Sequence, residues 1–233
     1  MKRFYETVGV EKVKAGYQLT LDGRPIRSPG RRDLVLPSRA LADAVGAEWE
    51  AQLETVDPTV MPTMSLVATA IDRVAPQREH VISTIAGFAK SDLLCYRAEE
   101  PADLTARQLV HWQPLLDWCA ETFNTPLSIT GGLMPLTQPK ESIVGLRSIV
   151  ATFDDLPLAA LHEITTLLGS LVIALAIVKG RITVGQGVDA AQLDETYQIE
   201  RWGEDAEAVS RRSKVRQDVL VAAEFLRLCH VLN

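Results

Sequence analysis

The stretch Leu167–Val178, LLGSLVIALAIV, is almost entirely apolar and lies in the second half of a 233-residue chain. It is too short to cross a bilayer, which requires about 20 apolar residues in a helix. Polar residues flank it on both sides, at His162–Thr166 and at Lys179–Gly180. We therefore expect a helix that is buried on all sides inside a helical domain, and no membrane insertion.

The composition around this stretch is that of a folded protein with a real core, because 47% of the residues are hydrophobic and 23% are charged. The net charge of −6 argues against nucleic-acid binding, which requires a basic face. The charge is unevenly distributed, since residues 1–39 have a net charge of +5 and residues 40–233 one of −11. This asymmetry indicates two regions with different surfaces.

Residues 1–62 are predicted to form an α+β domain that begins with a β-sheet. Tyr17–Leu21 alternates between apolar and polar residues, and Asp22–Gly23 is a strong hairpin-turn signal after it. The expected strands are Phe4–Val10, Tyr17–Leu21, Arg24–Arg27 and Leu34–Leu36.

One helix, Ala40–Glu54, completes this first domain, with Ser38 as its N-cap. Apolar residues recur every fourth position and are predicted to share one buried face: Leu41, Val45, Trp49 and Leu53. The Pro-punctuated segment Asp57–Thr63 follows and is the expected link to a second domain, residues 63–233.

The second domain has a mostly helical pattern. The expected fold class is therefore α+β, a small N-terminal β-containing domain followed by a larger all-helical domain. Pro126–Pro139 is predicted to be extended, and the apolar stretch is expected to continue the preceding helix. The expected helices are Leu66–Val74, Gln77–Lys90, Leu104–Phe123 with a kink at Pro114, Glu141–Phe153, Leu158–Gly169, Ser170–Val178, Thr183–Leu193 and Glu204–Leu232.

Catalytic and metal-binding signatures are weak in this sequence. The three cysteines (Cys95, Cys119 and Cys229) are far apart and are expected to be free thiols of a reducing compartment. The four histidines lack a second histidine or cysteine at metal-site spacing. We therefore expect no catalytic residues, no cofactor and no metal, and a binding protein is favoured over an enzyme. The alternative is a small metal-assisted hydrolase that uses the acidic residues near Glu195–Glu207.

The most distinctive polar stretch is Glu195–Ala208, ETYQIERWGEDAEA, which combines five acidic residues with one arginine and two aromatic residues. Acidic residues are favourable at a helix N-terminus, so the stretch can be the start of the final helix. An aromatic residue beside carboxylates is also typical of a surface that recognises a basic partner. The two interpretations are compatible.

Nine segments, in order and over most of the chain, resemble the family of assembly chaperones of the F-type ATP synthase catalytic head. None of them is a catalytic signature, and the resemblance depends on their combination. The segments are FYETVGV, LTLDGRPIRSP, LVLPS, AEWEAQ around Trp49, DPTVMPTMSLVATAIDRV, SDLLCYRAEEP, QLVHWQPLLDW, GSLVIALAIVKG and DETYQIERWGEDAEA.

The resemblance implies a protein without enzymatic activity that binds the unassembled alpha subunit and shields its subunit interface until beta replaces it. The family's acidic motif falls on residues 202–207 of this sequence. On this basis we expect a monomer whose carboxylates contact basic groups of alpha, with Trp202 as a neighbouring anchor. The candidate partner-binding residues are Trp202, Glu204, Asp205, Glu207 and Glu200.

The chain starts with MKRFYETVGV, which has neither the apolar run of a signal peptide nor the pattern of a transit peptide. Mitochondrial members of the family are expected to have a targeting extension, so the sequence indicates a bacterial, cytoplasmic member, with the mitochondrial matrix as the location of organellar relatives. An adaptor for a different basic client is a further possibility that the sequence leaves open.

Overall fold

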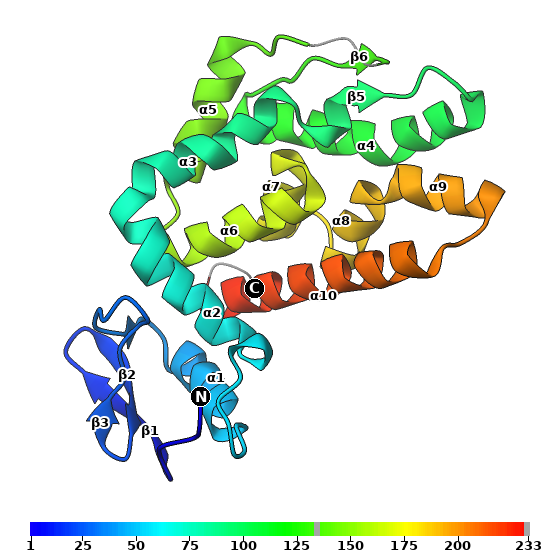
Figure 1. The fold of residues 1–233 in the computed structure, drawn as a ribbon. Helices are drawn as coiled ribbons and strands as arrows, with labels where there is room; N and C mark the ends of the chain where they lie inside the picture. The colour runs from blue at the N-terminus through cyan, green and yellow to red at the C-terminus, as the bar shows by residue number, and fades with distance from the viewer. Residues whose placement is uncertain (133–135, 231–233) are drawn as a thin grey trace. The chain divides into compact units, whose positions relative to one another are not determined.

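The computed structural model describes residues 1–132 and 136–230, and these form two compact units (Figure 1). The first unit comprises residues 1–78, residues 155–160 and the described residues from Glu224 on. The second comprises residues 79–154, without 133–135, and residues 161–223. The expected α+β class is confirmed, because a small strand region precedes a mostly helical part. A domain boundary after residue 62 remains a prediction.

The sheet of the first unit is antiparallel, with strand order β1-β2-β3 and β4 paired with the other end of β2. Leu21 pairs with Arg24, so the predicted hairpin turn at Asp22–Gly23 is confirmed. Both turn residues have positive φ, 50° and 73°, as a two-residue hairpin of this kind requires. The strands are β1 Val8–Val13, β2 Gly16–Leu21, β3 Arg24–Pro25 and β4 Val35–Leu36.

The predicted first strand, Phe4–Val10, is wrong in its bounds, because β1 starts at Val8 and extends to Val13. A hairpin with Val13 paired with Gly16 joins it to β2. The residues before β1 pair with the segment after the first helix instead, since the backbone N–H of Arg3 donates to the carbonyl oxygen of Glu54 at 2.9 Å. This contact is distant in sequence, and local alternation does not reveal it.

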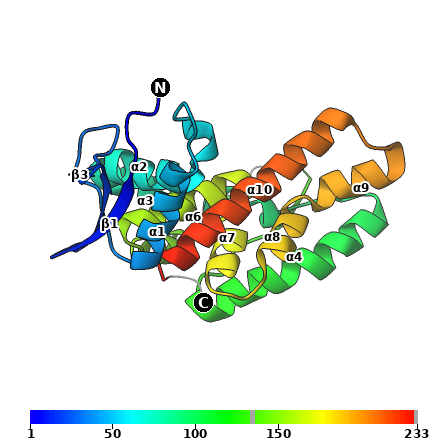
Figure 2. The same ribbon diagram turned by 90° about the horizontal axis from the view of Figure 1, so that it is seen from below.

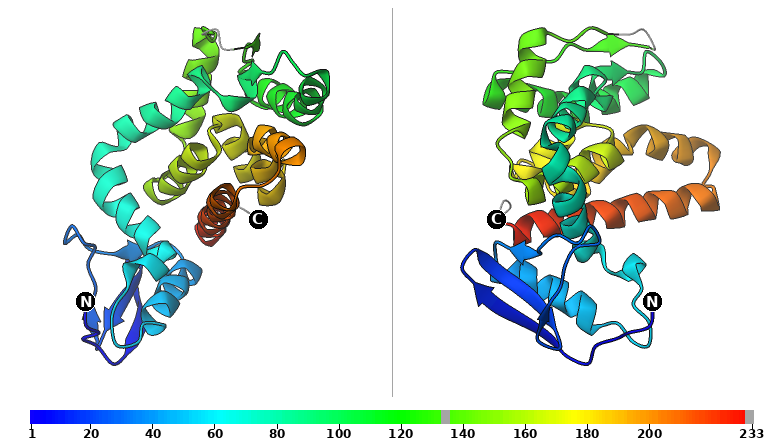
Figure 3. Two further views of the ribbon diagram at one scale, coloured as in Figure 1. Left: turned by 45° about the vertical axis from the view of Figure 1, so that its right-hand side comes forward. Right: turned by 60° about the vertical axis from the view of Figure 1, so that its left-hand side comes forward.

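Helix α1, Arg39–Glu50, packs against β1 and β2 (Figure 3). Ser38 caps it as predicted, and its hydroxyl oxygen accepts from the N–H of Leu41 at 3.0 Å. The predicted apolar face is only partly right. Leu41 and Val45 are buried, Trp49 is half-buried, and Leu53 lies beyond the helix end with 82% of its surface exposed.

The predicted extended link before the second helix is also partly wrong. Pro58–Val60 forms a 3-10 turn, and helix α2 already begins at Pro62, where proline fits the first helical turn. α2 covers Pro62–Thr69 and continues as a π-helical turn, Ala70–Val74, followed by α3, Arg78–Gly87.

The remaining helices follow the predicted pattern, with one addition, α9, that the sequence did not predict. A short parallel ladder between β5, Tyr96–Arg97, and β6, Thr130–Gly131, is also unpredicted. The helices are α4 Ala102–Phe123, α5 Lys140–Val150, α6 Asp155–Leu168, α7 Leu171–Val178, α8 Val184–Ala191, α9 Leu193–Trp202 and α10 Ala206–Leu228.

Helix α7 is the buried core of the second unit, because all eight of its residues are buried. It is a separate helix rather than a continuation of α6, since Gly169 adopts a left-handed conformation (φ 65°) and Ser170 caps α7. Among the described residues no helix is long and apolar enough to cross a membrane.

Two predictions extend outside the described residues. The expected extended stretch Pro126–Pro139 includes residues 133–135, and the predicted end of the final helix at Leu232 lies beyond residue 230.

Candidate partner-binding site

The acidic stretch Glu195–Ala208 spans two helices and the turn between them. α9 ends at Trp202, Gly203–Asp205 forms the connection, and α10 begins at Ala206 (Figures 1 and 2). The end of the stretch starts the final helix, as expected, but its first part, Glu195–Trp202, belongs to α9, which the sequence did not predict. Gly203 has a φ of 91°, which ends α9 at a conformation that favours glycine.

Helix α9 lies beside α4 and is fixed to it by polar contacts (Figure 2). The hydroxyl of Tyr197 donates to Asp103 Oδ1 at 2.7 Å, and the guanidinium of Arg201 pairs with the other oxygen of the same carboxylate. Further along, Arg107 pairs with Glu200 at 2.6 Å. Together these contacts hold the C-terminal half of α9 in one position.

The tyrosine at this contact is enclosed by cations. Arg201 and Arg107 lie over its ring, with their guanidinium carbons 4.6 and 5.3 Å from the ring centre. The hydrogen bond from Tyr197 and the neighbouring Arg201 lower the pKa of Asp103, so this carboxylate stays charged. Burial, reinforced by the bond to Asp103, raises the pKa of Tyr197, which keeps the hydroxyl a proton donor.

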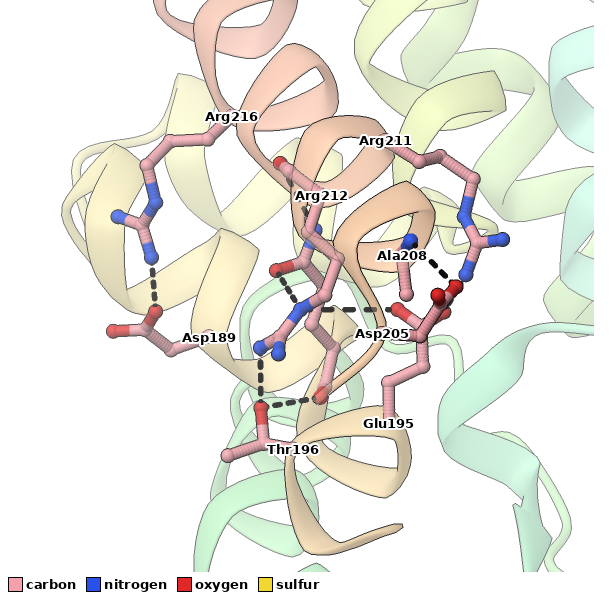
Figure 4. A network of polar contacts seen from close by, with 9 residues as sticks. Asp189, Glu195, Thr196, Asp205, Ala208, Arg211, Arg212 and Arg216 are labelled. Carbon is pink, nitrogen blue, oxygen red and sulfur yellow. Dashed lines mark hydrogen bonds and ion pairs between the residues drawn. The ribbon is translucent and has the colours of Figure 1, made fainter. Parts of the chain in front are cut away.

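Helix α10 holds the other side of α9 through a row of arginines (Figure 4). Arg211 pairs with Glu195, and Arg212 donates to the hydroxyl oxygen of Thr196 at 2.6 Å. Glu207 lies four residues before Arg211 on α10, but Arg211 pairs with Glu195 across the turn, because α10 returns antiparallel to α9.

The tip between the helices, residues 202–207, presents the predicted partner-binding residues. Trp202 is 76% exposed, and Glu204, Asp205 and Glu207 are exposed beside it. Asp205 also has a local role, since its Oδ2 accepts from the N–H of Ala208 at 3.3 Å and caps α10. The fifth candidate, Glu200, lies two residues before Trp202 and pairs with Arg107.

The residues that position the tip were not found from the sequence. Asp103 and Arg107 lie on α4, about 90 residues before their partners, and no local pattern connects them with α9. The spacing of Leu193 and Tyr197, which are both buried, would have been the available signal for an amphipathic α9.

The described residues provide little support for metal chemistry at this site. No group of three or more His, Cys, Asp or Glu side chains among them is arranged to hold a metal ion. Glu195 and Glu200 are paired with arginines, and Asp205 is used as a cap. All three cysteines are free; Cys95 and Cys119 are buried, and burial raises the pKa of each of these two thiols, to about 12 and about 11.

Comparison with known proteins supports the resemblance seen in the sequence. A family model described as ATP12 chaperone protein matches residues 2–120. Protein atp12, mitochondrial, of Schizosaccharomyces pombe is 24% identical over 244 residues, which cover 98% of this chain and 82% of that protein.

Two solved bacterial structures match nearly the whole chain. Atp12 from Paracoccus denitrificans matches with a TM-score of 0.94 at 38% identity, over 98% of both chains. The Atu1473 protein from Agrobacterium tumefaciens matches with a TM-score of 0.91 at 43% identity, over 97% of this chain and 85% of that one. Because the family model spans half of the sequence and these structures span nearly all of it, the chain belongs to the ATP12 chaperone family.

Proposed function

We propose that this protein is an assembly chaperone of the F-type ATP synthase catalytic head. It binds the unassembled alpha subunit and shields the alpha interface that beta later occupies. Membership of the ATP12 chaperone family supports the chaperone role. Subunits of a ring expose apolar interfaces when they are alone, and a protein that covers them lowers the concentration of aggregating species.

The observation that carries the proposal is the tip at residues 202–207. An indole with 76% of its surface exposed is unusual for a folded monomer and is a common anchor in protein interfaces. The three carboxylates next to it (Glu204, Asp205 and Glu207) give the tip a local charge of −3. Such a field attracts a basic surface and speeds its association.

The hydrogen bonds and ion pairs that hold α9 suit this role, because they fix the position of the tip before the partner binds. Contacts with α4 hold one side of the helix and contacts with α10 hold the other. A preorganised tip loses little conformational entropy when the partner arrives, so more of the contact energy contributes to affinity. We further propose a monomeric, non-enzymatic protein of the bacterial cytoplasm.

The test is capture of tagged alpha subunit by the full chain, with Glu204→Lys and Trp202→Ala compared with wild type. Glu121→Lys is the matched control, because Glu121 is exposed on α4 and carries the same charge change. We expect both tip variants to lose most of the capture and the control to retain it. Equal capture by folded Glu204→Lys and wild type would overturn the role of the tip.

The same purified protein and its captured material also distinguish the chaperone proposal from the two alternative functions. A metal-assisted hydrolase predicts stoichiometric metal in the purified protein, which elemental analysis measures. An adaptor for another basic client predicts a different major protein in mass spectra of the captured material. Capture of alpha by metal-free protein supports the chaperone proposal over both.

A further inference from the structure

A pocket of about 650 Å³ lies in the second unit, lined by residues of α4, α8, α9, α10 and the segment before α8. Its lining includes the apolar side chains Leu115, Ile182 and Leu193. Val110, also on its lining, is 67% exposed. The pocket therefore combines an apolar surface with an accessible edge, which suits an apolar side chain from another molecule.

The charge of the pocket is opposite to that of the protein as a whole. Three arginines line it (Arg107, Arg181 and Arg212) together with His111, against one acid, Asp189. Asp189 is already paired with Arg216 of α10, as Figure 4 shows. In a chain with a net charge of −6, this is a local positive surface.

The three arginines differ in what they already bind. Arg107 is paired with Glu200, and Arg212 donates to Thr196 and Gln192 in the network of Figure 4. Arg181 is exposed, and within the described part of the chain it forms no side-chain hydrogen bond or ion pair. Arg181 is therefore the cation that is available to an incoming carboxylate.

Pro114 interrupts the hydrogen bonding of α4 beside the pocket. Pro114 lies inside the helix and has no N–H, so it cannot donate to the carbonyl oxygen of Val110, four residues earlier. Both residues line the pocket.

From these features we propose that the pocket binds a short acidic segment of the client polypeptide that also contains a large apolar side chain. The client carboxylate pairs with Arg181, and the apolar side chain packs on Val110 and Ile182. The proposal rests on the proposed function, since the client is the one held by the tip. Charge complementarity favours an acidic occupant over a basic one.

The two surfaces would define the orientation of the client. α9 contributes Leu193 and Thr196 to the pocket and ends at Trp202 in the tip. A client that binds both surfaces must present an acidic, apolar segment to the pocket, near the start of α9, and a basic patch to the tip, at the end of α9. A surface of uniform charge fits only one of the two, so the pair discriminates against general polyanions and polycations.

The experiment uses the full chain and three fluorescein-labelled synthetic peptides, measured by fluorescence anisotropy. The first alternates leucine with aspartate, the second replaces aspartate by lysine, and the third replaces leucine by serine. We expect only the first to bind, and Arg181→Glu to weaken its binding about tenfold or more, as loss of a charged partner does. Lys140→Glu is the matched control, because Lys140 is exposed on α5 and lies outside the pocket lining.

Capture of alpha by the same variants distinguishes this inference from the proposed function. If wild type fails to capture alpha, the chaperone proposal fails. The pocket proposal alone is overturned by a combination of three results. Wild type captures alpha, Arg181→Glu captures alpha equally well, and the acidic peptide does not bind. Equal binding of the leucine and serine peptides, with displacement by millimolar inorganic phosphate, would also overturn it by identifying a small-anion site.

Discussion

Tyr197 of α9 donates its hydroxyl proton to Asp103 of α4, 94 residues earlier in the chain, at 2.7 Å. Asp103 lies in the first turn of α4, where a carboxylate is favoured by the helix dipole. The same carboxylate also pairs with Arg201, one helical turn after the tyrosine. One acidic side chain of α4 thus fixes the end of α9 that leads into the tip.

Tyr197→Phe is expected to loosen α9 while preserving the packing of the ring. The variant removes the bond to Asp103 and changes no charge at the tip. Amide hydrogen exchange in residues 193–202 should become faster, because the local opening free energy falls. Capture of alpha should weaken in parallel. Unchanged exchange in this segment would show that the ion pairs alone hold the helix.

Asp205 is expected to have two separable roles. Asp205→Asn retains a good N-cap acceptor and removes the charge, so its stability should remain close to wild type while capture of alpha falls. Asp205→Ala loses the cap as well and should cost about 1 kcal/mol of unfolding free energy in addition. Chemical denaturation and capture are measured for both variants. Full capture by Asp205→Asn would assign this residue to the cap alone.

The packing of α8 on α7 gives a prediction with an internal control. A Cβ on Gly187 would lie 2.6 Å from Ile177 Cδ1, and this isoleucine is enclosed in the buried helix. Gly187→Ala should therefore cost about 1–3 kcal/mol by overpacking. On the same helix, a Cβ on Gly185 meets its nearest atom at 3.8 Å. Gly185→Ala should be neutral or stabilise by up to about 1 kcal/mol, which thermal or urea unfolding will show.

Asp92 predicts a pH dependence of stability. It is fully buried at the N-terminus of α7, where Ser170 donates to Oδ1 at 2.7 Å and the N–H of Val172 donates to Oδ2 at 3.1 Å. Burial raises the pKa of Asp92 from 3.8 to about 6, and the hydrogen bonds offset only part of this effect. The folded protein therefore holds this proton more tightly than the unfolded chain.

The contribution of Asp92 to the unfolding free energy is thus fully present below about pH 4 and is lost as the pH rises through about 6. At about 1.4 kcal/mol per pKa unit, the change is on the order of 3 kcal/mol. The measurement is the difference in unfolding free energy between wild type and Asp92→Asn across this window. Other carboxylates titrate in both proteins and cancel. A constant difference would place the pKa of Asp92 near its ordinary value.

Much of the architecture follows from local sequence. The turn at Asp22–Gly23, the Ser38 cap and the buried stretch Leu171–Val178 were all predicted, because each depends on backbone preferences or on hydrophobic pattern within a few residues. The capping box of α8 also lies within four residues, since the Thr183 hydroxyl and the Gln186 side chain each accept a backbone N–H, but only the helix itself was predicted. The tip residues singled out in the sequence are exposed, and their role in partner binding stays a prediction.

Only the tertiary structure showed that residues 195–202 belong to a separate helix, α9. The high charge of this stretch obscured the helix in the sequence, because its apolar contacts are limited to one narrow face. Arg211 could pair locally with Glu207, but the return of α10 along α9 places Glu195 within reach instead. Likewise, the cationic pocket is lined by side chains that are up to about 100 residues apart in the sequence, from Arg107 to Arg212, so no local pattern could reveal it. Short-range preferences determined most of the helices and strands of this protein, and long-range packing determined α9, the β5–β6 ladder and which charges meet.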